Sequence, residues 1–290
     1  RISIDKTAID ILHFYFSQVT DEYFKKINEK FTSNQEDAYS FSFETVIFQK
    51  NGIVFCSDSK NEKQNLTEAL IYFSLQFMIA HELGHIFNGH CEYKKSLSFN
   101  SRFQIFEPET ANKKSTGLSP LDQRTLEYDA DAFATTDNFR FLLQEVISNP
   151  SQLGIIYWWS FAITSLFLKI GSIQMATSSP TTDMRYLTSS MRWRTIYEIV
   201  ETIIHTEDYN IKYNDEEFIK RIEKLLFFGS LDAEKYFKEI NVESNLSYIS
   251  DAINSKYDNN YFTEIQNNWN TLYKKLQPYA HLPLFKNKNK

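Results

Sequence analysis

The stretch AHELGHIFNGH, residues 80–90, places two histidines four positions apart and a glutamate directly after the first of them. In an α-helix, side chains at positions i and i+4 lie on one face, one turn apart. His81 and His85 can therefore present two imidazole nitrogens to one metal ion if this segment is helical. Glu82 is rotated by about 100° from His81, which places it beside the ion. The spacing predicts a helix that carries two metal ligands and a base.

Zinc suits this pattern because its catalytic sites combine imidazole ligands with an open position for water. A zinc-bound water has a pKa of about 7, so a neighbouring carboxylate can accept its proton. Glu82 is therefore the candidate general base, and Gly84 lets the helix approach a neighbour closely. The same three residues also occur by chance on a protein surface, or in a core where the histidines are hydrogen-bonded and bind no metal. A third ligand is therefore needed to distinguish a metal site from these cases.

The residues just after the motif do not supply that ligand. A metzincin needs Gly and His three and six positions after its second histidine, where this chain has Asn88 and Cys91, so that class is excluded. His90 follows the glycine that should end the helix, and we expect its side chain to point elsewhere. Three further carboxylates lack a supporting pattern: Glu92, Glu107 and Glu109.

The segment LEYDADAFA, residues 126–134, offers better candidates. Glu127 and Asp131 again stand four positions apart, with Ala130 and Ala134 beside them. Small residues allow this helix to pack tightly on the histidine helix, so that Glu127 can reach the metal as the third ligand. Asp131 can then accept a hydrogen bond from the other nitrogen of a histidine ligand, which fixes its tautomer and orientation. The alternative is a solvated acidic helix face.

Helical spacing of apolar residues recurs along much of the chain and predicts a mainly α fold. One helix is expected over 5–31, the histidine helix over 65–89, and the helix that carries Glu127 over 120–147. Residues 38–58 alternate instead, with Asn-Gly between two β-prone runs, which predicts an antiparallel hairpin at 41–57. Residues 91–118 are polar and are expected to form an irregular connection.

The segment LGIIYWWSFAITSLFLKIG, residues 153–171, is nearly continuous apolar sequence, close to the length of a membrane span. Its flanks show no charge asymmetry, and it contains four polar side chains: Ser160, Thr164, Ser165 and Lys169. We predict an apolar helix at 153–170 that is buried in a soluble domain. A membrane helix is the alternative.

Charge and cysteine content narrow the classes of function. The formal net charge is −6 over 290 residues, and no basic cluster flanks the motif, so we expect no nucleic-acid partner. Two cysteines, Cys56 and Cys91, are too few for a disulfide framework and are typical of a reducing compartment. The first residues lack the pattern of a signal peptide. A cytoplasmic protein is therefore expected.

The ordered blocks resemble the gluzincin zinc metallopeptidases related to the CAAX prenyl proteases and to bacterial heat-shock membrane peptidases. HELGH at 81–85 and EYDAD at 127–131 match the blocks His-Glu-x-x-His and Glu-x-Asp/Glu-Ala-Asp. After the apolar segment, SSPTTDMR at 178–185 matches a third block, Ser-His-Pro-x-x-x-x-Arg, except that Ser179 replaces the histidine. The resemblance covers roughly residues 65–195. HELGHIFNGH also resembles the soluble phage-exclusion peptidases of bacteria.

The resemblance implies a role for each matched residue. Glu82 would be the general base and then the proton donor to the leaving amine, and Asp131 would orient a histidine ligand. Arg185 would anchor the wall of the active site or contact the substrate, and Arg185 and Tyr186 are candidates for the second oxyanion donor. The zinc ligands would be His81, His85 and Glu127.

The resemblance also implies an α+β zincin-like core over 1–206, followed by a helical C-terminal portion over 207–290. The expected function is a zinc-dependent endopeptidase that cuts a protein or peptide substrate, with a role in bacterial cell defence. The hairpin at 41–57 would bind an extended peptide by backbone hydrogen bonds. Two alternatives stay open: a catalytically inactive, zinc-stabilised interaction module, and a membrane peptidase if 153–171 spans a bilayer.

Overall fold

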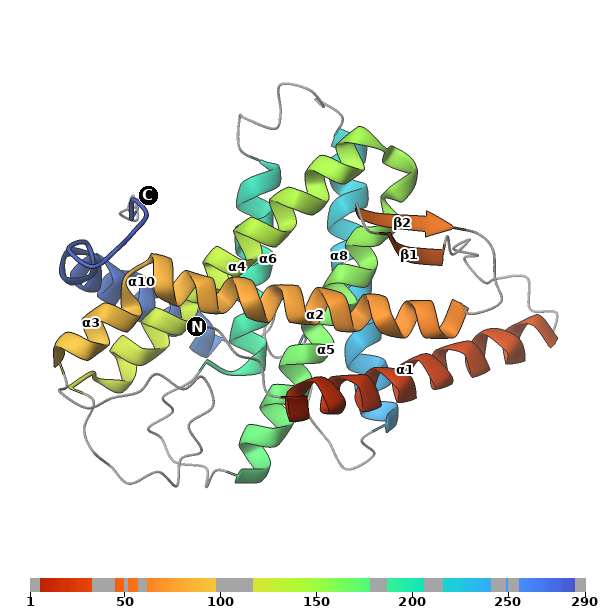
Figure 1. Ribbon diagram of the computed structural model, residues 1–290, viewed down its shortest axis with the longest axis horizontal. Helices are drawn as coiled ribbons and strands as arrows, with labels where there is room; N and C mark the ends of the chain where they lie inside the picture. Colours follow the sequence, from red (N-terminus) through yellow and green to blue (C-terminus); the bar gives the residue numbers. More distant parts are fainter. Residues whose placement is uncertain are drawn as a thin grey trace. The chain divides into compact units, whose positions relative to one another are not determined.

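The computed structural model describes residues 6–32, 45–49, 52–56, 62–97, 117–177, 187–205, 216–240, 249 and 256–284. Most of these residues are helical (Figure 1), so the predicted mainly α class is confirmed. The helices are α1 (Lys6–Thr32), α2 (Glu62–Phe87), α3 (His90–Leu97), α4 (Pro120–Ser148), α5 (Gly154–Thr177), α6 (Ser189–Ile204), α8 (Glu216–Ile240) and α10 (Lys256–Leu276), with a 3₁₀ helix η1 (Pro150–Gln152).

A single hairpin accounts for the strands in the described part of the chain. Strands β1 (Thr45–Gln49) and β2 (Gly52–Cys56) pair antiparallel, with Gln49 opposite Gly52. They pair with no other strand among the described residues. A two-stranded hairpin alone is marginally stable, because a sheet needs a third strand or a packed helix. The small antiparallel sheet expected for a zincin-like α+β core is therefore not supported.

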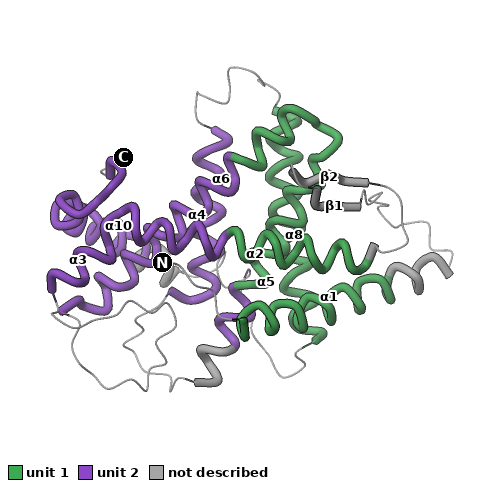
Figure 2. The backbone as a smooth tube through the Cα atoms, in the orientation of Figure 1, with its two compact units in different colours: residues 1–76, 141–166, 213–247 green, residues 77–140, 167–212, 248–290 purple. Residues whose placement is uncertain are grey.

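The chain forms two compact units, each assembled from three stretches of sequence (Figure 2). Unit 1 comprises 1–76, 141–166 and 213–247, and unit 2 comprises 77–140, 167–212 and 248–290. Helix α8 belongs to unit 1 and α10 to unit 2, and the division expected at residue 206 stays a prediction. Contacts far apart in sequence, which periodicity does not report, determine the units.

The apolar segment predicted at 153–170 is helix α5. The span Pro150–Ser172 is long and apolar enough to cross a membrane, but 78% of its most apolar window is buried inside the protein. In unit 1 this helix contacts α8 closely, since a Cβ on Gly229 would lie 2.4 Å from the carbonyl oxygen of Tyr157. Helix α5 is therefore largely covered by the rest of the protein.

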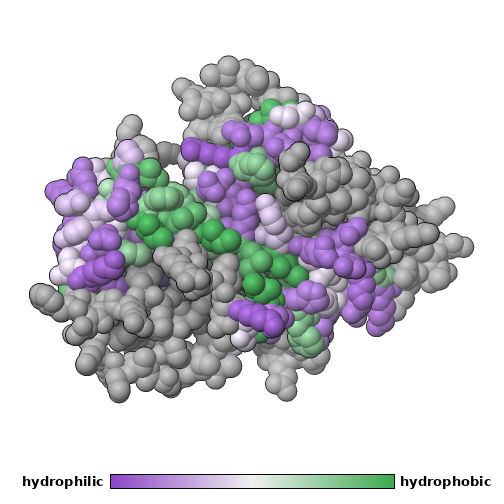
Figure 3. All heavy atoms as spheres, viewed as in Figure 1, coloured by the Kyte–Doolittle hydropathy of each residue, from purple (hydrophilic) through white to green (hydrophobic). Residues whose placement is uncertain are grey.

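Helix α2 is apolar around most of its circumference. Leu70, Phe73 and Phe77 are buried, while Tyr72 and Ile79 are 37% and 39% exposed. Figure 3 shows apolar residues along α2 on the face that it draws. Packing on most sides, rather than intrinsic propensity, stabilises such a helix. The histidines in its last turns therefore stand on a well-supported element.

Helix α2 ends next to the glycine that the sequence marks as its end. Gly89 has a φ of +79°, in the left-handed region that glycine enters without steric cost. The chain then turns directly into α3, where the N–H of Tyr93 donates to the carbonyl of Gly89 at 2.9 Å. Residues 91–97, expected to be irregular, are thus helical. The segment is too short to show an apolar repeat, so periodicity does not predict this helix. Lys94 and Lys95 lie in its last turn, where positive charges stabilise the C-terminal end of a helix.

A segment after α10 closes the C-terminal end of α2. The N–H groups of His281 and Leu282 donate to the carbonyl oxygen of Phe87 at 2.7 and 3.3 Å. Carbonyls in the last turn of a helix have no partner within the helix, so these bonds satisfy one of them. A Cβ on Gly89 would lie 2.6 Å from the carbonyl carbon of Tyr279. Gly89 is therefore required both by its conformation and by this contact.

Helix α4 begins with a reciprocal cap between Ser119 and Asp122. The hydroxyl of Ser119 accepts a hydrogen bond from the N–H of Asp122 at 3.0 Å, and the carboxylate of Asp122 accepts one from the N–H of Ser119 at 3.1 Å. Pro120 is the first helical residue, where a missing N–H costs nothing. The start of the helix that carries Glu127 is thereby fixed.

Helices α2 and α4 lie in close contact at Gly84. A Cβ there would lie 3.1 Å from the Cβ of Phe133 and 3.2 Å from the Cα of Ala130. Ala130 and Ala134 are completely buried. The small residues noted in both sequence motifs therefore form the contact between the two helices, and this contact sets the distance from α2 to Glu127.

We predict that Gly84→Leu pushes α4 away from α2 and destabilises the protein. Overpacking at a tight helix contact costs about 1–3 kcal/mol of unfolding free energy, measurable by urea denaturation. Gly154→Leu is the matched control, because Gly154 is exposed and a Cβ there meets no atom within 4 Å. Equal stability of the two variants would contradict the close approach at Gly84.

Candidate metal centre

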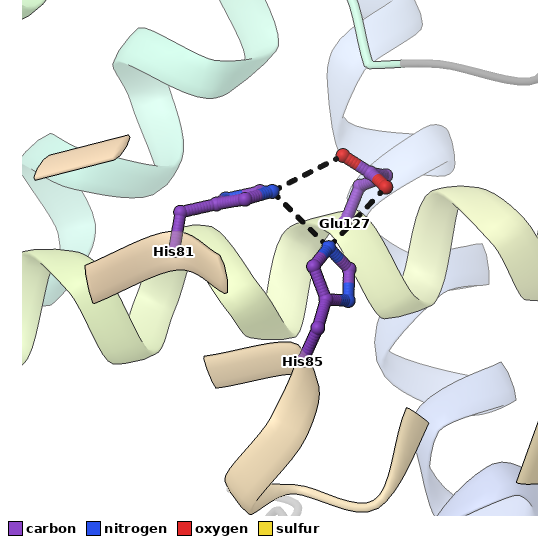
Figure 4. Close-up of side chains that lie close together, drawn as sticks. All are labelled: His81, His85 and Glu127. Atoms are coloured by element: carbon purple, nitrogen blue, oxygen red, sulfur yellow. Dashed lines mark hydrogen bonds and ion pairs between the residues drawn. The ribbon is translucent and has the colours of Figure 1, made fainter. Parts of the chain in front are cut away.

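Three ligand-type side chains from two helices point at one another (Figure 4). His81 and His85 come from α2 and Glu127 from α4, and one ligand atom of each lies within 4.8 Å of the others. The Nε2 atoms of the two histidines are 3.1 Å apart. Glu127 Oε2 lies 3.5 Å from Nε2 of His81, and its Oε1 lies 3.5 Å from Nε2 of His85. The two helices thus bring together the three residues that the sequence singles out.

These distances leave room for one ion among the three side chains. Ligand atoms about 2.0–2.2 Å from zinc, at tetrahedral angles, lie about 3.3–3.6 Å from one another. The two Nε2 atoms are 3.1 Å apart, and each lies 3.5 Å from a different oxygen of Glu127. With one ligand atom from each residue, the three atoms lie within 4.8 Å of one another, so a small shift of the carboxylate would bring them to that range. Two imidazoles and a carboxylate are also the donor types that zinc accepts. Both histidines are buried, at 5% and 1% exposed, so the group is preorganised rather than a surface coincidence.

Asp131 contacts the far side of His81. Its Oδ1 lies 2.8 Å from Nδ1 of His81, and the residue is completely buried. The carboxylate accepts the proton of Nδ1, so whenever the ring of His81 is neutral its Nε2 carries no hydrogen and faces Glu127. This is the orienting contact that the four-residue spacing of Glu127 and Asp131 anticipates.

Arg192, on α6, contacts both carboxylates of α4. Its guanidinium donates to Oδ1 of Asp131 and to Oε2 of Glu127, each at 2.9 Å, and it is 8% exposed. One buried cation therefore stabilises the buried carboxylate of Asp131 and the partly buried carboxylate of Glu127. Sequence reasoning missed Arg192, although an arginine between the apolar residues Met191 and Trp193 signals a buried partner.

Burial and charge set distinct pKa values for the two histidines. Burial opposes protonation of His81, but hydrogen bonds and charge from Asp131 and Glu127 outweigh it and raise its pKa to about 9. Burial lowers the pKa of His85 to about 4, against the opposing effect of Glu127. Burial would raise the pKa of Glu127, but hydrogen bonds from His81 and His85 bring it well below its ordinary value. The cluster thus holds an ionised carboxylate beside a neutral His85.

Glu82 lies at the edge of the cluster. Its Oε1 is 3.9 Å from Nε2 of His81, and its side chain is 14% exposed. Burial raises its pKa to about 7; the charge of His81 lowers it, and that of Glu127 raises it. A carboxylate with a pKa near neutrality can accept and return a proton. The structure therefore places Glu82 beside the group and not within it.

The other candidates are divided between described and undescribed segments. Arg185, Tyr186 and Ser179 lie outside the described residues, as do Glu107 and Glu109. The roles expected of Arg185 and Tyr186 stay predictions. Glu92 is exposed on α3, where its carboxylate pairs with Lys95 at 3.2 Å, so it is not a ligand of this cluster.

His90 is buried and contacts the side of His85 that faces away from Glu127. From the sequence we expected only that His90 would point away from the metal, and its contact with His85 was not predicted. Its Nδ1 lies 2.8 Å from Nδ1 of His85, and its Nε2 lies 3.1 Å from Oδ2 of Asp129. The amide of Asn88 donates to the same Oδ2 at 2.5 Å. The signal in the sequence was the turn at Gly89, which reverses the chain after α2.

We predict that Arg192→Gln strongly destabilises the metal-free protein. Removing one partner of a buried ionic group leaves its carboxylates uncompensated, which costs about 3 kcal/mol or more. Lys95→Gln on α3 is the control, because Lys95 and its partner Glu92 are both exposed, at 63% and 51%, and a surface pair contributes about 1 kcal/mol or less. Chemical denaturation of both variants measures the difference, and similar losses would contradict the role of Arg192.

Comparisons with protein-family models, curated proteins and solved structures found no match for this chain, so the site is interpreted from its own geometry.

Proposed function

We propose that this protein is a zinc-dependent endopeptidase that hydrolyses peptide bonds in a protein substrate. The single observation that carries the proposal is the convergence of His81, His85 and Glu127 with Glu82 beside them. No other arrangement in the described part of the chain combines a ligand group with a carboxylate poised near neutral pKa. The protein would belong functionally with the gluzincins that its motifs resemble, and it would act in the cytoplasm.

The composition of the site favours catalysis over a purely structural role. Structural zinc sites normally close with four protein ligands, whereas catalytic sites use three and leave a position for water or substrate. The cluster comprises three ligand side chains among the described residues. A structural site also has no use for a carboxylate such as Glu82 at its edge. The inactive, zinc-stabilised module is thus the weaker alternative.

The residues would divide the work as follows. His81, His85 and Glu127 would hold the ion, which supplies Lewis-acid activation of water and of the scissile carbonyl when bound. Glu82 would accept the proton of the attacking water and return it to the leaving amine nitrogen. Asp131 and Arg192 would hold His81 and Glu127 in place through the contacts described above.

The proposed substrate is a protein or peptide, because the proposed reaction hydrolyses a peptide bond. The resemblance of HELGHIFNGH to phage-exclusion peptidases supports a role in bacterial cell defence. The predicted docking of an extended peptide along the hairpin is also a proposal, since β1 and β2 are described by their backbone pairing alone.

Glu82→Gln should abolish hydrolysis while zinc stays bound. The amide cannot accept a proton, and loss of a general base lowers the rate by about 100- to 10,000-fold. Cleavage of unfolded casein and of a synthetic peptide library, followed by mass spectrometry, measures activity, and elemental analysis measures zinc. Glu92→Gln is the matched control on an exposed carboxylate. Undiminished cleavage by Glu82→Gln would reject the mechanism. A wild type that binds zinc but cuts neither probe would favour the inactive module.

Glu127→Ala should weaken zinc binding. It removes one of three protein ligands and leaves Arg192 without one of its two carboxylate partners. Dialysis against a chelator, followed by titration with zinc in the presence of a chromophoric indicator, gives the dissociation constant. Full zinc occupancy in this variant, at the affinity of wild type, would show that Glu127 is not a ligand.

A further inference from the structure

We propose that His90 is a positioning residue for His85: it accepts the outer proton of the His85 ring and thereby directs Nε2 of His85 to the metal. The inference rests on the proposed zinc site and adds to it a residue outside the three ligands. It also assigns a role to Asp129 and Asn88, which contact no ligand themselves but hold His90 in place.

The geometry places the two rings in direct contact. Nδ1 of His85 and Nδ1 of His90 are 2.8 Å apart, and the ring planes are inclined at 68° with centroids 5.0 Å apart. His90 is completely buried, and His85 is 1% exposed. At this distance and burial the two nitrogens share one proton, because two N–H groups would repel and two bare nitrogens would be left unpaired.

The position of that proton follows from the metal site. His85 can bind an ion only through a bare nitrogen, and its Nε2 faces Nε2 of His81 at 3.1 Å and Glu127 at 3.5 Å. The proton of the neutral His85 ring must therefore lie on Nδ1, where it is donated to His90. If His90 donated instead, the proton of His85 would occupy Nε2 and block the ligand position.

Asp129 favours the same order from the other end. His90 accepts at Nδ1, so its own proton lies on Nε2. That nitrogen is 3.1 Å from Oδ2 of Asp129, which is an ion-pair distance without the angle of a hydrogen bond. An ionised carboxylate is an acceptor only, so a bare Nε2 at this distance would face it lone pair to lone pair. The amide of Asn88 donates to the same oxygen at 2.5 Å, which holds the carboxylate toward His90. Asp129 thus disfavours the His90 tautomer that would donate to His85.

The local fold explains why a histidine five positions after His85 reaches it. Gly89 adopts a φ of +79°, which turns the chain back so that His90 begins α3 against the last turn of α2. The two ligands are consequently oriented by different groups. His81 donates to the carboxylate of Asp131, whereas His85 donates to an imidazole.

Two amide substitutions separate the hydrogen bond from packing. In His90→Asn, the side-chain oxygen lies where Nδ1 was and can still accept from His85. In His90→Gln, the longer side chain carries its amide to the position of Nε2, toward Asp129, and leaves His85 without its acceptor. His13→Gln is the control, because His13 is exposed on α1.

The readouts are the zinc dissociation constant, by indicator competition, and the visible absorption spectrum of the cobalt(II)-substituted protein. His90→Gln should weaken zinc binding by about 10- to 100-fold, the usual cost of losing an outer partner of a ligand. It should also shift the cobalt bands, since His85 is no longer held. His90→Asn should stay within about 5-fold of wild type because it keeps an acceptor, and His13→Gln should match wild type. Thermal unfolding of the metal-free proteins accompanies each titration.

The outcomes distinguish this inference from the proposed function. If wild type binds no zinc, the metal site itself is wrong and the inference falls with it. If wild type binds zinc and His90→Gln binds it equally well with the same cobalt spectrum, the role of His90 alone is refuted. Equal weakening in His90→Asn and His90→Gln would assign His90 to packing and would overturn the inference too.

Discussion

The close approach of α2 and α4 is the constraint on which the site depends. Two helices separated by ordinary side chains could not bring Glu127 to the imidazoles of α2, because its carboxylate must reach both Nε2 atoms. Gly84 and the buried Ala130 remove the side-chain volume between the backbones. The small residues at the contact between α2 and α4 thus set the geometry of the cluster. The side chains of His81, His85 and Glu127 lie next to this contact.

That approach has an electrostatic cost that the surrounding residues offset. It buries Asp131 completely and Glu127 partly, on consecutive turns of α4, and like charges taken out of water are strongly unfavourable. Arg192 donates to both carboxylates at 2.9 Å. His81 adds a hydrogen bond from its Nδ1 to the carboxylate of Asp131. A divalent cation would add to this compensation. The contacts of Arg192 and His81 thus stabilise the carboxylates without a metal, and a cation bound as proposed would stabilise them further.

Much of the site follows from residue spacing, and the remainder depends on contacts that spacing does not encode. Four-residue intervals place His81 with His85, and Glu127 with Asp131, whatever the tertiary fold. Arg192 could not be found this way, because its partners lie on another helix more than sixty positions earlier. His90 was likewise inaccessible, because its direction depends on the φ of Gly89. The end of α2 near Gly89 and the start of α4 after Ser119 were predictable, because glycine, serine and proline act on the local backbone. The two units and the helix over residues 91–97 were not predictable in this way.

The bonds from His281 and Leu282 to Phe87 join the end of the histidine helix to a segment made much later during synthesis. On the ribosome, α2 emerges with that carbonyl open to water, and its closing partner does not yet exist. The last turn, which carries His85, is consequently free to fray until the later segment arrives. The proposed centre would then be complete only after residue 282 has been made, and a chain truncated before it would lack these two hydrogen bonds at the end of α2.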